Sequence, residues 1–462
     1  MNYIKKALAC AAATGVATFA SAAPEVSNVT MTQDASNGRL VTITYNLSED
    51  AVVTLDVLTN ATPNAATGWV SIGGEAICNA QGAVWRKVTS ADADGNGNYT
   101  ITWRPDLSWT DEIGKGFKVA DGCAKAVLTA WSLNNTPNYM VVDISSAAQP
   151  NTQKYYPSVD FLPGGILGNP DYRTGMLVMR KIMAKDVTWM MGSTTLETQR
   201  TAASEATHQV TLTNNYYIGV FQLTQAQWDL IQTSRLAPAY FSDVNDRAMR
   251  PVENVSYNEI RNAANATAAN TAYDWPADPN PGSFLGLLRT KTGIDFDLPS
   301  DAQWEFAARA GNGDTKWGDG SAILNTDRDA NLDRLGRYGL NGGQTPTYAA
   351  PQPWWGATNG TPIVGSYLPN SWGLYDMHGN LWEWCLDWYE DGITANGGKV
   401  NVNHAAPANT LSGASGVNRV IRGGSWLNVS AGLFRSALRT YSVPTNRGFN
   451  VGFRVSCTAG LQ

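Results

Sequence analysis

One stretch constrains the fold of this chain more than any other, because it is too rich in large rings to be an ordinary loop. Residues 370–389 read NSWGLYDMHGNLWEWCLDWY and contain six aromatic rings, two glycines and three acids. The stretch has neither the 3.6-residue period of a helix nor the alternation of a strand. Rings of this size need burial, and irregular buried backbone needs partners from side chains, water or an ion. We therefore expect this stretch to form the centre of the larger domain.

The length and composition indicate two loop-rich globular domains. At 462 residues the chain exceeds what one core usually organises. Charged residues are only 16%, while there are 44 Gly, 17 Trp and 18 Tyr, a profile that is typical of a globular chain and not of a disordered one. The formal net charge of −6 gives no electrostatic basis for binding nucleic acid or an anionic membrane. We exclude nucleic acid as a partner.

The N-terminus has the pattern of a secretory signal peptide. Lys5 and Lys6 precede an apolar run over residues 7–19, and Ala20-Ser21-Ala22 satisfies the small-x-small rule for cleavage. We expect residues 1–22 to be removed, which predicts a secreted, periplasmic or cell-surface protein. No later run is long and apolar enough to suggest a membrane span.

Removal of the signal peptide would remove Cys10 and leave four cysteines, an even number in an exported protein. Cys78 and Cys123 both fall in the first half of the chain and are predicted to form a disulfide. For Cys385 and Cys457 a disulfide and two buried free thiols both stay open, because spacing alone does not determine geometry.

Residues 24–147 have the pattern of an all-β domain. Five segments alternate apolar and polar residues and are bounded by Asn, Asp, Gly or Pro, with no helical pattern between them. They are residues 40–47, 52–58, 98–103, 125–133 and 139–144. This predicts an antiparallel sandwich of the immunoglobulin or fibronectin type. Residues 148–172, rich in Pro, Gly, Asn and Gln, are interpreted as a linker that partly packs on its neighbour.

The second domain, residues 173–458, contains three helix starts with the same local chemistry. Each has a hydroxyl residue followed three positions later by Gln or Glu, which is the pattern of a capping box: Thr224 with Gln227, Ser256 with Glu259, and Ser300 with Gln303. Gly311 is a natural stop for the third helix. Long stretches beyond it show almost no period, so an α+β architecture is predicted.

Several segments of this domain, taken in order, resemble the formylglycine-generating enzyme (sulfatase-modifying factor) family. They are HQVTLTNNYYIGVFQLTQAQW (208–228), RPVENVSYNEI (250–260), DLPSDAQWEFAARAG (297–311), KWGDG (316–320), the aromatic stretch, RVIRGGSW (419–426) and NVGFRV (450–455). The resemblance implies a C-type-lectin-like fold, in which a small twisted sheet and two helices support long ordered loops.

The resemblance also implies that oxidase activity needs residues that this chain lacks. Active members hold copper with two cysteines five residues apart, shortly after a Gly-Gly-Ser-aromatic turn. Laying residues 423–426 on that turn puts Asn428 and Leu433 at those positions, and neither is a soft ligand for Cu(I). We therefore expect no copper and no catalytic residues. The alternative is a metal-dependent oxidase of the formylglycine-generating type that uses another site, involving Cys385.

Structural calcium is the cofactor that the resemblance favours. Asp376 and Glu383 match acidic ligands of the family, with the backbone carbonyls of Gly379 and Leu381 between them, and hard oxygen ligands from one tight loop suit calcium. The plain alternative is that the two acids only bond neighbouring amides. A second family position would use Asn331 and the carbonyl of Leu332, but its acidic partner before Pro362 is absent.

The C-terminal stretch 422–455 alternates residues that look fixed by the fold with bulky residues that have no periodic reason to be buried. This pattern suggests an exposed surface that binds a protein or carbohydrate ligand. It also resembles the variable region of diversity-generating-retroelement target proteins. In that region the diversified codons encode residues such as Asn, Ser, Thr, Tyr, Val, Leu, Phe, Ala and Gly, but not Lys, Glu, Gln, Met or Trp, and the bulky positions of this stretch carry only residues of the first kind. The predicted ligand-binding residues are Leu427, Asn428, Val429, Leu433, Phe434, Leu438, Thr440, Tyr441, Val443 and Phe449.

Overall fold

The computed structural model describes residues 23–461 with internal gaps at 35, 37–38, 110–120, 198, 203, 234–235, 242–244, 263–272, 274–276, 342–359 and 390–416. The predicted signal peptide and Cys10 therefore lie outside the described residues. None of the helices in the described ranges has the length and apolar character that a bilayer crossing requires.

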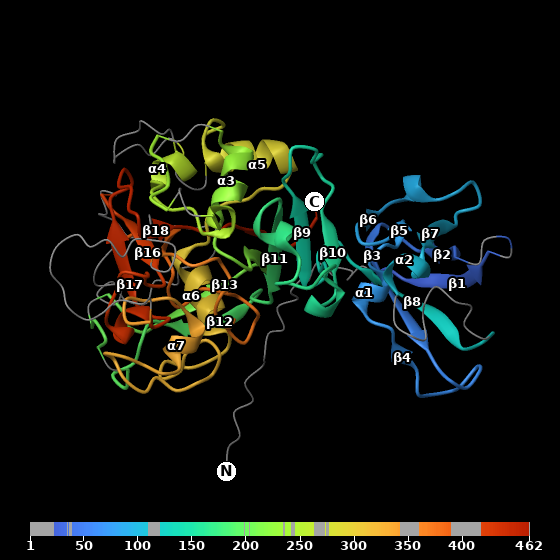
Figure 1. The fold of residues 1–462 in the computed structure, drawn as a ribbon, viewed down its shortest axis with the longest axis horizontal. Helices are drawn as coiled ribbons and strands as arrows, with labels where there is room; N and C mark the ends of the chain where they lie inside the picture. Colours follow the sequence, from blue (N-terminus) through green and yellow to red (C-terminus); the bar gives the residue numbers. More distant parts are fainter. Residues whose placement is uncertain are drawn as a thin grey trace, which may run out of the picture.

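The N-terminal part consists of two antiparallel sheets, as the sequence predicted (Figure 1). Its apolar residues alternate inward along the strands; in β2, for example, Val41, Ile43 and Tyr45 are buried. One sheet contains β1 (Val26–Gln33), β2 (Val41–Leu47), β7 (Tyr99–Trp103) and β5 (Gln81–Gly82). The other contains β4 (Val70–Ser71), β3 (Ala51–Thr59), β6 (Lys87–Val88) and β8 (Ala124–Trp131), with the short helices α1 (Gly74–Ile77) and α2 (Pro105–Ser108) beside them.

The fifth predicted strand, β9 (Tyr139–Asp143), does not join the sandwich. It pairs with β11 from Met176↔Asp143 to Arg180↔Tyr139 in a five-stranded sheet of the second part. The segment interpreted as a linker supplies the edge strand of the same sheet. The order across the sheet is β10 (Lys154–Tyr156), β9, β11 (Met176–Ile182), β14 (Tyr216–Gly219) and β19 (Ser456–Thr458). The sequence predicts β9 as a sandwich strand because its alternating pattern continues that of the preceding strands. Only its pairing with β10 and β11 shows that it belongs to the other sheet.

The second part adds two small sheets and several short helices, which together make the α+β architecture predicted from the sequence. The strands are β12 (Val187–Met191) with β13 (His208–Leu212), and β17 (Arg439–Ser442), β16 (Arg419–Arg422), β15 (Trp382–Trp388) and β18 (Val451–Gly452) in that order. The helices are α3 (Gln225–Ile231), α4 (Tyr257–Ile260), α5 (Phe284–Thr292), α6 (Asp301–Arg309) and α7 (Leu332–Leu335).

All three predicted capping boxes form, at the starts of α3, α4 and α6. α6 ends one residue earlier than predicted: its C-cap is Ala310, which takes the left-handed conformation with φ 48°, and not Gly311. α5 was missed. Its N-cap Ser283 accepts a hydrogen bond from Gly286, and its C-cap Gly293 is left-handed with φ 70°, so the helix has both terminal signals without a capping-box acid or amide.

The aromatic stretch is the buried centre of the second part. Its second half is β15, whose seven residues are all buried, which explains why the hydrophobic alternation of a half-exposed strand is absent. Trp382 and Trp384 pack into the largest apolar cluster with α3 and α5. Two acids of the same strand, Glu383 and Asp387, face α6. Glu383 accepts a hydrogen bond from the indole N–H of Trp304, and Asp387 accepts one from the backbone N–H of Asp301.

The predicted disulfide between Cys78 and Cys123 is not formed, since the four cysteines of the described residues are free thiols. Cys78 is the residue after α1. The Cys123 thiol instead donates to the carbonyl of Ala61 at 3.8 Å, and the Cys123 carbonyl accepts from the backbone N–H of Asn60. Cys123 is therefore engaged with Asn60 and Ala61 and not with Cys78.

Candidate functional site

The loop that leads into β15 turns several oxygen atoms toward one point. Asp376, Gly379 and Asn380 have φ values of 58°, 135° and 68°, positive values that L-residues rarely adopt. This conformation directs the carbonyl oxygens of Asp376, Gly379 and Leu381 to the same side as the Glu383 carboxylate. Three of the four predicted calcium ligands, the Gly379 and Leu381 carbonyls and the Glu383 carboxylate, are thus brought together, whereas Asp376 joins them with its backbone carbonyl and not with the predicted carboxylate.

The point on which these oxygens converge is occupied by the side-chain amide of Gln222, which follows β14 in the sequence. Gln222 Nε2 lies 2.9 Å from Glu383 Oε1 and 3.0 Å from the carbonyl oxygen of Leu381. Its distances to the carbonyl oxygens of Gly379 and Asp376 are 3.4 Å and 3.5 Å. Gln222 was not among the residues predicted from the sequence.

The Glu383 carboxylate has two further partners on its other side. Arg454 donates to both oxygens at 2.7 Å, in the bidentate geometry that gives the strongest arginine–carboxylate pairs. The indole N–H of Trp304 donates to Oε2 at 2.9 Å. The side chains of Arg454 and Glu383 are both fully buried, so the charge of Glu383 is balanced within the protein.

Asp376 contributes its backbone carbonyl to this group and directs a carboxylate oxygen elsewhere. Its Oδ2 accepts from the backbone N–H of Gly365 at 2.8 Å. Burial raises the pKa of Asp376 to about 6, although the Gly365 hydrogen bond and the charge of Arg454 act in the opposite direction. The arrangement therefore does not fit a calcium ion at the convergence point while Gln222 lies there, and calcium binding stays a prediction.

The second predicted calcium position is organised by a different acid. The amide of Asn331 donates to the carbonyl of Ala322, and the carbonyl of Leu332 accepts from Gly336 within α7. The fully buried Asp329 carboxylate accepts four backbone N–H groups, those of Leu324, Asn325, Asn331 and Leu332. In the described residues no group of three or more His, Cys, Asp or Glu side chains is arranged to hold a metal ion.

The positions that would hold copper are used for packing and turn formation. Asn428 Oδ1 accepts from the backbone N–H and the hydroxyl of Ser425 at 2.9 and 2.8 Å. Leu433 is half-buried and packs against the clusters around Trp384 and Trp317. Burial raises the pKa of both the Cys385 and the Cys457 thiols well above the ordinary cysteine value, and thiols of this kind are inert.

The residues predicted to bind a ligand divide into three groups. Tyr441 and Val443 are exposed, at 51% and 40%. Leu427, Asn428, Val429, Leu433, Thr440 and Phe449 are half-buried. Phe434 and Leu438 are buried: Phe434 packs on Tyr338 at a ring-centroid distance of 5.4 Å, and Leu438 belongs to the main apolar cluster. These last two side chains belong to the core and are not available to a ligand.

Two of the predicted positions, Tyr441 and Phe449, belong to aromatic pairs. The ring of Tyr441 lies 4.6 Å from that of Tyr389, over which the Arg439 guanidinium is placed at 4.8 Å. The ring of Phe449 lies 5.6 Å from that of Tyr240, which is 43% exposed. Tyr240 was not predicted, because it lies about two hundred residues before its neighbour and carries no local signal.

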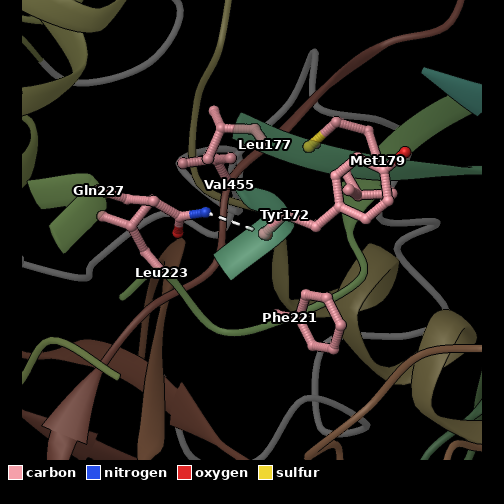
Figure 2. A pocket seen from close by; sticks show the side chains of 9 residues that line it. Tyr172, Leu177, Met179, Phe221, Leu223, Gln227 and Val455 are labelled. Atoms are coloured by element: carbon pink, nitrogen blue, oxygen red, sulfur yellow. Dashed lines mark hydrogen bonds between the residues drawn. The ribbon is translucent and has the colours of Figure 1, made fainter. Parts of the chain in front are cut away.

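A small, mainly apolar cavity lies against strands β11 and β14 of the five-stranded sheet, and no residue of the two aromatic pairs lines it. Figure 2 shows its lining, in which Gln227 of α3 directs its amide toward the carbonyl of Tyr172 at 3.3 Å. The same amide donates to Met176, while its oxygen accepts from Thr224. Gln227 therefore fixes the start of α3 against the sheet.

His378, inside the aromatic stretch, is a fully satisfied neutral imidazole. Its Nδ1 donates to the carbonyl of Phe434 at 2.8 Å, and its Nε2 accepts from the backbone N–H of Gly318 at 3.0 Å. Burial lowers the pKa of His378, against smaller raising effects of the Phe434 bond and of Asp319. The folded protein thus takes up this proton at a lower pH than the unfolded chain, whose histidine pKa is about 6.5.

Replacing His378 with glutamine tests this assignment. The stability that wild-type His378 contributes should be fully present above about pH 6.5 and decline as the pH falls below it, by at most about 1.4 kcal/mol per pH unit. Urea unfolding of both proteins between about pH 5 and pH 8 gives the difference between their free energies of unfolding at each pH. A difference that stays constant, or that grows toward acid pH, would contradict a neutral buried His378.

The second part of the chain matches the model of a known family, the sulfatase-modifying factor enzyme 1-like domain, over residues 178–459. A formylglycine-generating enzyme of Thermomonospora curvata is 28% identical over 220 residues, which cover 46% of this chain and 57% of that protein. One from Streptomyces coelicolor is 33% identical over 170 residues, covering 36% and 47%. The chain thus spans about half the length of these relatives.

Among solved structures, Treponema denticola variable protein 1 aligns with a TM-score of 0.42 at 27% identity, covering 61% of this chain and 95% of that one. The family match extends over more than half of the chain and contains the loop around Glu383, the capped helices and the C-terminal strands. The chain belongs to the family of the sulfatase-modifying factor enzyme 1-like domain.

Proposed function

We propose that this chain is an exported protein whose sulfatase-modifying-factor-like domain binds a protein or carbohydrate ligand through its C-terminal loops, without oxidising cysteine. The observation that carries the proposal is the use of Asn428 and Leu433. The Asn428 oxygen closes a turn with Ser425, and Leu433 packs on apolar neighbours, so neither position offers a thiolate to a metal. The remaining thiols of the domain, Cys385 and Cys457, are buried.

The ligand surface in this proposal is centred on Tyr441 and Val443, at and just beyond the end of the edge strand β17. Tyr441 combines exposure with a ring neighbour in Tyr389, over whose ring the Arg439 guanidinium lies. Aromatic rings held by neighbours lose little conformational freedom when they bind, which is why tyrosine is frequent at recognition surfaces. Phe449 and Tyr240 form a second aromatic pair of the same kind.

The test compares turnover with binding. A cysteine-containing sulfatase peptide, incubated with the protein and copper, should give no aldehyde by hydrazide trapping, and Cys385 should resist alkylation until the protein is unfolded. Aldehyde formation that is lost in Cys385→Ser would support the metal-dependent oxidase instead.

A glycan array and a panel of cell-surface proteins provide the binding probes. The Tyr441→Ala variant should lose about tenfold or more in affinity for whichever probe is bound, the effect of removing an aromatic anchor. The control is Val70→Ala, which truncates a side chain that is 65% exposed in the sandwich. Equal affinities of the wild type and Tyr441→Ala would place the surface elsewhere.

We further propose that the C-terminal loops are diversified. The ten positions predicted to bind a ligand, from Leu427 to Phe449, carry only Leu, Asn, Val, Phe, Thr and Tyr and no Lys, Glu, Gln, Met or Trp, whereas Arg435 and Arg439 between them are buried and ion-paired. The neighbouring DNA tests this idea. A reverse-transcriptase gene beside a near-copy of the segment encoding 422–455, differing only at adenines, is the expected finding; a lone gene without that copy would contradict it.

A further inference from the structure

We infer that the side-chain amide of Gln222 takes the place of the calcium ion that the family resemblance implies, so that the loop over residues 376–383 is held without metal. The amide nitrogen is surrounded by the Glu383 carboxylate and by the carbonyl oxygens of Asp376, Gly379 and Leu381. These oxygens come from a single loop, and Gln222 reaches them from a segment more than 150 residues earlier.

The size of the oxygen group fits an amide. Calcium–oxygen distances are about 2.3–2.6 Å, whereas N–H···O hydrogen bonds are about 2.7–3.2 Å. The two shortest distances from Gln222 Nε2, to Glu383 and Leu381, are 2.9 and 3.0 Å. The orientation of the amide follows from the same contacts, since turning it over would set Oε1 against four other oxygens.

The charge around Gln222 also fits a neutral donor. The one carboxylate that faces the amide, that of Glu383, already forms a buried bidentate pair with Arg454. A divalent cation here would place two positive charges beside the buried Arg454 guanidinium, in a group where Glu383, Asp376 and Arg454 together carry one negative charge. A neutral amide offers its two N–H groups to the nearest of these oxygens, Glu383 Oε1 and the Leu381 carbonyl, and adds no charge.

At the second family position, too, the expected ligands are engaged within the protein. There the Asp329 carboxylate gathers the backbone N–H groups of Leu324 and Asn325 with those of Asn331 and Leu332. The Leu332 carbonyl, one of the expected ligands, is engaged by Gly336. At both positions a protein side chain organises the loop for which an ion was expected.

The experiment measures the thermal unfolding midpoint of the wild type and of Gln222→Glu in EDTA and in millimolar calcium. The wild-type midpoint should change by less than about 1 °C, because a ligand that does not bind the native state does not shift it. In Gln222→Glu a second carboxylate faces Glu383. Its midpoint should fall in EDTA and rise by about 3 °C or more when calcium is added.

The matched control is Gln227→Glu. Gln227 is also a buried glutamine whose amide donates to carbonyl oxygens, those of Tyr172 and Met176 (Figure 2), but no carboxylate faces it. Gln227→Glu should lose stability without a response to calcium. A Gln222→Glu protein that behaves like this control would overturn the inference.

Calcium binding by the wild type tests the inference even if the Gln222→Glu variant does not fold. Isothermal titration of EDTA-treated wild type with calcium chloride, and elemental analysis after gel filtration, should detect no stoichiometric calcium. One tightly bound calcium per chain, with a wild-type midpoint that drops by several degrees in EDTA, would show that Gln222 does not replace the ion.

Discussion

Replacing Glu383 with alanine is expected to lower the free energy of unfolding by about 3–5 kcal/mol, the usual cost of leaving a buried charge without its partner. The Arg454 side chain is fully buried and donates to both Glu383 oxygens. Its remaining partners are the carbonyl oxygens of Gly219, Val220 and Tyr375, which cannot neutralise it. The indole N–H of Trp304 would lose its acceptor as well, and the amide of Gln222 would lose the nearest of its acceptors.

Urea unfolding followed by tryptophan fluorescence measures this loss, since the surrounding core is rich in tryptophan. The control is Arg328→Ala, which removes an ion pair with Asp333 on the surface, where the Arg328 side chain is 62% exposed. Such pairs contribute at most about 1 kcal/mol. A loss in Glu383→Ala as small as that of the control would mean that water enters the cluster and solvates Arg454.

Local chemistry explains which parts of the fold could be predicted. The strands of the sandwich and the capping boxes of α3, α4 and α6 depend on residues within a few positions of one another, and the structure confirms them. β9 and α5 mark the limit of this approach. The sheet to which β9 belongs is decided by pairing with Met176–Arg180, and α5 begins with Ser283 alone, without a reciprocal partner.

The candidate site shows the same division between local and distant information. The spacing from Asp376 to Glu383 predicted that the Gly379 and Leu381 carbonyls and the Glu383 carboxylate converge, because one tight loop determines that geometry, but it did not predict that Asp376 would contribute its backbone carbonyl in place of its carboxylate. The group at their centre comes from Gln222, and no spacing inside the loop could identify it. The C-terminal surface was overestimated for a related reason, since Phe434 is buried by contact with Tyr338 and Leu438 by the main core.

Replacing Gly379 with alanine is expected to destabilise the protein by about 3–5 kcal/mol, from two costs that act together. Gly379 has φ 135°, a region that is open essentially to glycine alone and costs other residues about 1–3 kcal/mol. A Cβ at this position would also overlap the carbonyl oxygen of Arg337 and lie 3.1 Å from the carbonyl carbon. Such overpacking costs a further amount of about 1–3 kcal/mol. The Arg337 carbonyl cannot easily move away, because it accepts the backbone N–H of Asn380 at 2.9 Å.

Gly311→Ala separates the two costs in this prediction. Gly311 also has a positive φ, 84°, but the nearest atom to an added Cβ is Trp372 Cζ2 at 3.9 Å, which is ordinary contact. This variant should lose only about 1–2 kcal/mol, from backbone strain. Urea unfolding of the two variants gives the excess loss in Gly379→Ala, which measures how tightly the Arg337 carbonyl is held against the turn. Equal losses would mean that the turn at Gly379 can move, and a turn that moves could not hold the carbonyl oxygens of Gly379 and Leu381 around Gln222.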